Sequence, residues 1–182
     1  MIPSKKRCLE ILKTYNVPRN IVNHSMVVSR LAVFLARELN KKGFNLDINK
    51  IEAAALLHDI KKMDGLIKGT SHAHEGWRLL RKIGYSNIAD IVKQHVVLEE
   101  NDDSSKILEA ELVNYSDKRV RHSRIVTLRE RFEDLKKRYG RDEEAIEFIN
   151  ILEQKTFEIE TKIFSNLDFE PEEIPKLIKI RH

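Results

Sequence analysis

The chain has 182 residues, of which 41% are hydrophobic and 34% charged, and its net charge is +4. This length suits one domain with a substantial core, and the mixing of Lys and Arg with Glu favours a solvated helical surface over a nucleic-acid-binding stripe. The single cysteine, Cys8, excludes an internal disulfide and a cysteine metal cluster.

Apolar residues recur at spacings of three and four along the chain, which is the helical period, and no alternating strand pattern is evident. Pro18 is expected to open the second helix, since its missing N–H does no harm there. Asp47 predicts the N-cap of the third helix, and Gly65 and Gly69 predict a loop after it. The predicted helices cover about 4–15, 18–43, 47–59, 71–84, 87–97, 106–120, 127–140 and 142–165.

The segments outside these helices are expected to be short or irregular. The acidic, serine-bearing stretch 99–105 predicts a loop, and the tail 166–182, with its two prolines, predicts at most a short helix. Thr127 and Glu130 are spaced as a capping box. We therefore expect an all-α fold, a single-domain helical bundle over 1–165.

The segment Ala53–Lys62 reads AAALLHDIKK and places His58 and Asp59 at the inner end of an apolar helix. A buried carboxylate is costly unless a partner satisfies it. Helical spacing also puts one metal-capable side chain on the apolar stripe of each of four other helices. These four residues are His24, His72, His95 and Asp117.

The second of two neighbouring histidines falls on a different helix face. His74 shares its face with Arg78 and Arg81, so His72 is expected to point inward and His74 to lie near the surface. Taken singly, each inward residue has a simple structural explanation, as a hydrogen-bonded core histidine or an aspartate paired with an arginine. Their coincidence favours convergence on a divalent cation, because several unpaired buried charges would be strongly unfavourable.

The order His24 … His58-Asp59 … Asp117 resembles the signature of the HD-domain metal-dependent phosphohydrolases. LLHDIKK is similar to the HDIGK-type segment of that family, with Lys61 at the position of its glycine, and HAHEGWRLL is similar to its H-x-x-x-G segment. The resemblance covers residues 21–139. It implies a helical bundle of the HD/phosphodiesterase type.

The resemblance also implies two metal ions. Binuclear members have two additional histidines, which His72 and His95 match, and the counterpart of Asp59 bridges both ions. Imidazole and carboxylate donors suit Mn, Fe, Co, Zn or Mg, so the type of ligand does not identify the metal. The residues that match the ligands of the first ion are His24, His58, Asp59 and Asp117.

Such an ion lowers the pKa of bound water toward neutrality and gives a hydroxide nucleophile for attack on phosphorus. Asp59 and Lys62 are the expected catalytic residues. Lys62 matches the lysine of the HDIGK-type segment and is also the first candidate phosphate contact, because cations offset charge on the phosphate oxygens. Lys118 and Arg121 are second candidates, since a basic residue at the end of a helix more often only interacts favourably with the helix dipole.

Four other residues receive structural roles. Glu75 is expected to be solvated rather than an outer acid or base, and Trp77 to fill a helix contact rather than stack on a base. His122 is expected in a solvated basic turn, and His182 in the tail.

The resemblance implies a metal-dependent hydrolase of phosphate ester or anhydride bonds, acting on a phosphorylated, nucleotide-like small molecule. Two alternatives stay open: a di-iron HD-fold oxygenase, and a non-catalytic nucleotide-binding regulator. The single cysteine favours a cytoplasmic protein. No apolar run approaches the roughly 18 residues of a membrane helix, so no membrane partner is expected. The mixed charges argue against a nucleic-acid partner. The long helix at 142–165 offers a contact for a homo-oligomer.

Overall fold

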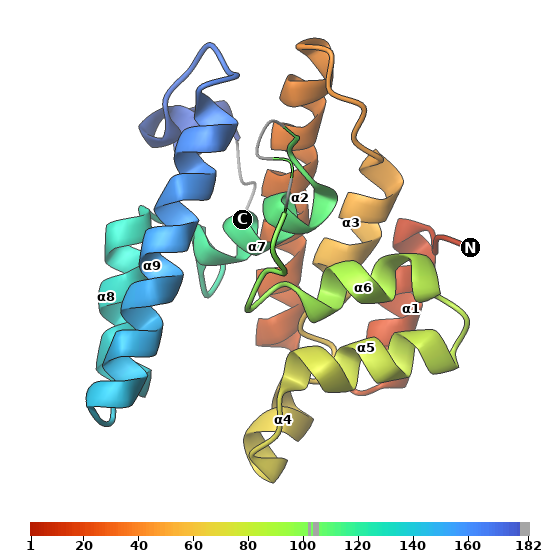
Figure 1. Cartoon of the computed structure of the whole chain (residues 1–182). Helices are drawn as coiled ribbons and strands as arrows, with labels where there is room; N and C mark the ends of the chain where they lie inside the picture. The colour runs from red at the N-terminus through yellow and green to blue at the C-terminus, as the bar shows by residue number, and fades with distance from the viewer. Residues whose placement is uncertain (102, 104–105, 179–182) are drawn as a thin grey trace.

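The computed structural model describes residues 1–101, 103 and 106–178, which form the predicted all-α fold (Figure 1). Part of the predicted loop (102, 104 and 105) and the end of the tail (179–182, with His182) lie outside the described residues. No described helix is long and apolar enough to span a membrane. The helices are α1 Lys5–Thr14, α2 Arg19–Lys41, α3 Ile48–Leu57, α4 Lys62–Lys68, α5 His72–Lys82, α6 Ser86–Lys93, α7 Glu109–Lys118, α8 Leu128–Tyr139, α9 Glu143–Phe164, the short 3-10 helix η1 Pro171–Glu173, and α10 Ile174–Leu177.

Side-chain caps fix the starts of five helices. Asp47 accepts hydrogen bonds from the backbone N–H groups of Asn49 and Lys50 at the start of α3. Thr127 and Glu130 form the predicted capping box of α8. Each cap satisfies backbone donors that the first helical turn leaves unpaired. Ser4, Ser71 and Asp142 cap α1, α5 and α9.

The loop predicted at Gly65 and Gly69 is wrong, because this segment forms α4. Gly69 ends the helix with a left-handed φ of 66°, a conformation that glycine adopts without strain. Gly65 lies inside the helix, where a Cβ would be 2.7 Å from the Cβ of His72. The missing side chain therefore lets α4 pack against the start of α5.

Two other local predictions also need correction. The fifth helix was expected to reach Val97, but α6 ends at Lys93 and His95 lies in the turn that follows. No strand was expected, but β1 Val120–Arg121 and β2 Arg124–Ile125 form an antiparallel hairpin. Strands of two residues are too short to show an alternating pattern.

The long helix α2 is central to the N-terminal part of the molecule (Figure 1). It packs along α3 and also contacts α7, while α5 and α6 pair with each other and α6 rests on α3. The buried core includes Leu31 and Leu35 of α2 and Leu56 of α3. This packing brings the ends of α3 and α6 beside α2 and α7.

The antiparallel helices α8 and α9 pack on each other and stand beside the central helices (Figure 1). A buried polar network joins α9 to α7. Arg119, which is 2% exposed, donates to Glu160 at 2.8 Å, and the Tyr115 hydroxyl donates to the same carboxylate at 2.6 Å. Lys162 donates to Glu111 at 2.8 Å. These contacts fix the C-terminal half of α9 against α7.

Candidate metal centre

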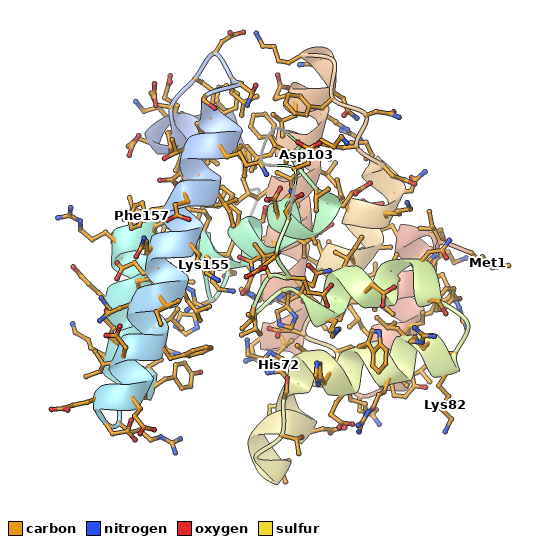
Figure 2. The ribbon with its side chains drawn as sticks, in the orientation of Figure 1. Met1, His72, Lys82, Asp103, Lys155 and Phe157 are labelled. Carbon is orange, nitrogen blue, oxygen red and sulfur yellow. The ribbon has the colours of Figure 1, made fainter. Side chains whose placement is uncertain are left out.

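Six side chains converge between α2, α7 and the ends of α3, α5 and α6. His72 is half-buried and the other five are buried. Figure 2 shows His72 where α5 begins, next to α4. His24 lies within α2, and Asp117 lies near the end of α7. His58 and Asp59 follow the last residue of α3. His72 begins α5, and His95 lies in the turn after α6.

The carboxylate of Asp59 divides the histidines into two groups. Its Oδ2 lies 3.4 Å from Nε2 of His58 and 3.9 Å from Nε2 of His24. Its Oδ1 lies 3.4 Å from Nε2 of His72 and 3.6 Å from Nε2 of His95. In each group of three residues the candidate ligand atoms all lie within 4.8 Å of one another. Asp59 therefore belongs to both groups.

Asp117 approaches the first group from α7. Its Oδ1 lies 2.9 Å from Nε2 of His24 and 3.4 Å from Nε2 of His58. Its Oδ2 accepts a hydrogen bond from Nζ of Lys118 at 3.0 Å. One oxygen of Asp117 thus faces the imidazoles while the other is held by a neighbouring lysine.

Three of the four histidines are oriented by backbone carbonyls. A carbonyl oxygen only accepts, so the Nδ1 atom that contacts it carries the proton, and Nε2 is directed at the centre. Outer hydrogen bonds of this kind orient metal-binding imidazoles and raise their basicity. The pairs are His24 with His122 at 2.9 Å, His58 with Ala55 at 2.8 Å, and His95 with Val92 at 2.7 Å.

Two buried atoms of the centre, Nε2 of His58 and Oδ1 of Asp59, have no hydrogen-bond partner within the described part of the chain. Unsatisfied buried polar atoms are costly. The Nε2 atoms of His72 and His95 also face each other at 3.0 Å. A divalent cation in each group would satisfy these atoms, and nitrogen and oxygen donors suit it. The residues present therefore fit divalent metal binding.

The charges of the centre interact strongly. Burial raises the pKa of Asp59, but His58 and Lys62 outweigh it and hold this pKa well below its usual range. Burial lowers the pKa of His58, but attraction to the carboxylates of Asp59 and Asp117 outweighs it and raises this pKa to about 10. Burial lowers the pKa of His95 to about 4 despite the contact with Asp59. At neutral pH the metal-free centre therefore holds an ionised Asp59, a protonated His58 and a neutral His95.

Metal loading is expected to release about one proton per chain at neutral pH, because a coordinated imidazole must be neutral and His58 is protonated beforehand. The raised pKa sets the sign: below about 10 the proton competes with the metal, so metal affinity should fall as the pH falls. Calorimetric titration of the metal-free protein in two buffers of different ionisation enthalpy would measure the released proton. Heats that do not depend on the buffer would contradict this assignment.

Two side chains of α7 hold the turn that carries His95. Nδ2 of Asn114 donates to the carbonyl of His95 at 3.0 Å and to that of Gln94 at 3.1 Å. Nζ of Lys118 donates to the same His95 carbonyl at 2.8 Å, in addition to its bond with Asp117. The helix that carries one ligand candidate of the first group therefore also positions one of the second.

A family model described as HD domain matches residues 21–122, more than half of the chain. The chain belongs to the HD-domain family. All six converging residues lie within the matched segment. HD domains are typical of metal-dependent hydrolases, and the clustered His and Asp residues fit that chemistry.

Three relatives show how far the similarity extends. The chain is 35% identical over 97 residues to the tRNA (cytidine(56)-2'-O)-methyltransferase of Thermoplasma volcanium, and this alignment covers 53% of this chain and 27% of that protein. It is 26% identical over 160 residues to an uncharacterized protein of Methanocaldococcus jannaschii, and the alignment covers 81% of this chain and 93% of that protein. It is 34% identical over 79 residues to ribonuclease Y of Pseudothermotoga lettingae, and the alignment covers 42% of this chain and 14% of that protein. No solved structure matches the chain.

Two cavities border the centre of this HD domain. The first, which we name the polar cleft, has a volume of about 290 Å³. Its lining includes Asp59 and four basic side chains, and this composition favours an anionic ligand. The basic residues are Lys62, Arg121, Arg131 and Arg138.

The second cavity, which we name the apolar chamber, has a volume of about 310 Å³. It lies against Asp59, His72 and His95 on one side and against α8 and α9 on the other. Four residues border both cavities, so the two meet beside the centre. These residues are Asp59, Lys62, Arg131 and Tyr139.

The three predicted phosphate contacts occupy different positions in the HD domain. Lys62 borders both cavities and donates to Oδ2 of Asp59 at 2.6 Å. Burial lowers the pKa of Lys62, but Asp59 and Asp117 outweigh it, so this pKa lies above its usual value. Arg121 borders the polar cleft. Lys118 borders the apolar chamber, but its buried ammonium already donates to two oxygens, and its role toward phosphate stays a prediction.

Several other predicted positions lie away from the centre. His74 is exposed, as helical spacing predicted. Glu75 pairs with Arg78 at 3.3 Å, and Nε1 of Trp77 donates to Asp90 at 2.8 Å, so both have surface or packing contacts.

Sequence reasoning missed two contributions to the site. The ring of His122 is exposed, as expected of a basic turn, but its backbone carbonyl orients His24. Arg131 was not singled out, although it borders both cavities and its buried Nε has no hydrogen-bond partner among residues 1–101, 103 and 106–178. Arg131 is one of several basic residues on α8, and only folding distinguishes it from the exposed Arg129.

Proposed function

We propose that this HD-domain protein is a phosphohydrolase that uses two divalent metal ions to cleave a phosphomonoester, phosphodiester or phosphoanhydride bond in a small molecule. Nucleotides are the first substrate class to test. The observation that carries the proposal is the placement of Asp59, whose two oxygens each face a pair of imidazole nitrogens. Two-metal sites with such donors are common among enzymes that act at phosphorus.

The two groups of side chains receive separate roles in this proposal. Asp59 belongs to both groups and would contact both ions. When bound, a divalent ion supplies Lewis acidity and lowers the pKa of a water ligand toward neutrality. The proposed ligands are His24, His58, Asp59 and Asp117 for the first ion, and Asp59, His72 and His95 for the second.

Lys62 and Arg131 are the proposed phosphate contacts. Both border the two cavities, and Arg131 is close enough to Lys62 to oppose its positive charge. An anionic phosphoryl group between them would offset this repulsion and give the unpaired Nε of Arg131 an acceptor. Asp59 holds the Lys62 ammonium in place through the hydrogen bond at 2.6 Å. Arg121 would face further anionic groups from the polar cleft.

A substrate and metal screen tests the proposal. Elemental analysis of the purified protein should find close to two metal equivalents per chain. Phosphate release from mononucleotides, cyclic nucleotides, dinucleoside polyphosphates and simple esters should appear with Mn, Co, Mg or Zn. A chelator should abolish this activity and added metal should restore it.

Two other results would reject hydrolysis. Oxygen consumption with Fe(II) and no phosphate release with any metal would assign the centre to an oxygenase. Tight nucleotide binding without turnover under any metal would assign it to a regulator.

Arg131→Met is expected to lower kcat/KM for phosphate release by about 100-fold, because a pre-positioned cation on the phosphate is removed while the aliphatic stem is kept. Steady-state kinetics and competition by inorganic phosphate would measure the loss. Arg129→Met changes an exposed arginine on the same helix and should leave both quantities unchanged. Equal effects of the two substitutions would show that Arg131 is not a phosphate contact.

A further inference from the structure

Most of the wall of the apolar chamber opposite the centre is one face of α9. Ala145, Phe148, Ile149 and Leu152 all border the chamber and follow the spacing i, i+3, i+4, i+7 of one helix side. Leu135 of α8 extends this wall. A helix normally buries such a stripe against another element, but here it borders about 310 Å³ of open volume next to charged side chains.

Within the part of the chain that the structure describes, the stripe is only partly covered by protein. Ile149 is buried, but Ala145 and Leu152 are half-buried and Phe148 is 48% exposed. A ligand that covers this apolar surface removes it from water and thereby lowers the free energy of the complex. The same surface offers no hydrogen bond to a polar ligand. The opposite side of the chamber, with Asp59, supplies the polar contacts. The chamber is therefore polar at one end and apolar at the other.

We propose that the substrate is a phosphate ester with a largely apolar alkyl or aryl group, and that the chamber binds this group. This inference rests on the proposed function, since the phosphoryl group would lie at Lys62 and Arg131, where the two cavities meet. It favours such an ester over a sugar phosphate or nucleotide whose sugar enters the chamber, because sugar hydroxyls would face the α9 stripe without partners. Any further polar or anionic part of the substrate would extend into the polar cleft.

The first test compares substrates with similar leaving groups and different polarity. For alkyl phosphates from methyl to hexyl, kcat/KM is expected to rise by about threefold to fourfold per methylene group until the chamber is filled. Glycerol phosphate, with a comparable alkoxide leaving group, should resemble the methyl ester. The binding of hexylphosphonate and methylphosphonate, whose P–C bonds are not hydrolysed, would be measured by calorimetry on the metal-loaded protein. The hexyl compound should bind more tightly.

Two matched substitutions on α9 test the place of binding. Phe148→Ser changes an exposed chamber residue and should lower kcat/KM for hexyl phosphate about tenfold, through KM, while the methyl ester changes less than about twofold. Phe157→Ser changes a phenylalanine of similar exposure, 40%, on the same helix (Figure 2) and should alter neither substrate.

The outcomes separate this inference from the proposed function. Hydrolysis that does not depend on chain length would overturn the inference and leave the phosphohydrolase intact. Chain-length-dependent phosphonate binding without hydrolysis of any ester would support the chamber and reject the phosphohydrolase. A chain-length dependence that persists unchanged in Phe148→Ser would place the apolar group elsewhere and overturn the inference.

Discussion

Asp59→Asn is expected to empty both metal positions and to lower phosphate release by more than about 1,000-fold, since metal-derived stabilisation of several kcal/mol is lost. The amide keeps the size of the side chain but removes the negative charge that would serve both ions. It also leaves the nearby Lys62 ammonium without its anionic partner. Elemental analysis after gel filtration, together with steady-state kinetics, measures both effects.

Circular dichroism would show whether the Asp59 variant still folds. The matched control is Asp168→Asn, which neutralises an exposed aspartate whose partner is Lys42. The control should keep its full metal content and rate. A variant at Asp59 that retains two ions would refute the bridging role.

His72→Gln is expected to reduce the metal content from two ions to one and to lower kcat by more than about 100-fold, because the first group keeps its donors while the second loses one of three. The reason is the separation of the two groups, which share only Asp59. Elemental analysis would count the ions, and kinetics at saturating metal would show whether excess metal rescues the rate.

His74→Gln is the control for this substitution, because His74 lies two residues later on the same helix and is exposed. It should behave as the unmodified protein does. One metal equivalent in the unmodified protein, with a rate unchanged by His72→Gln, would reject the binuclear centre.

Long regular helices made much of the fold and centre predictable from sequence. The spacing of apolar residues predicted that His24 and Asp117 lie on buried faces of α2 and α7, and both residues are buried. The capping box at Thr127 also fixed the start of α8. Such signals are local, so the sequence alone carries them.

Other features depend on contacts between distant segments. His95 is buried as expected, but in the turn after α6, where Asn114 and Lys118 hold its carbonyl. Gly65 suggested a loop, whereas its lack of a side chain serves the close approach of α4 to His72. The position of Arg131 beside both cavities follows only from the packing of α8 against α7.

The α9 stripe lies beyond the segment that matches the HD-domain model, which ends at residue 122. In the proposed function, the metal ligands and the apolar wall thereby fall on two consecutive stretches of the chain, and Arg131 is the phosphate contact that belongs to the second stretch. Exchanging the hairpin at 128–164 for that of another family member, with an arginine kept at position 131, should transplant selectivity while the metals stay in place. On this proposal, new specificities can arise by remodelling an accessory module, with the metal ligands left unchanged.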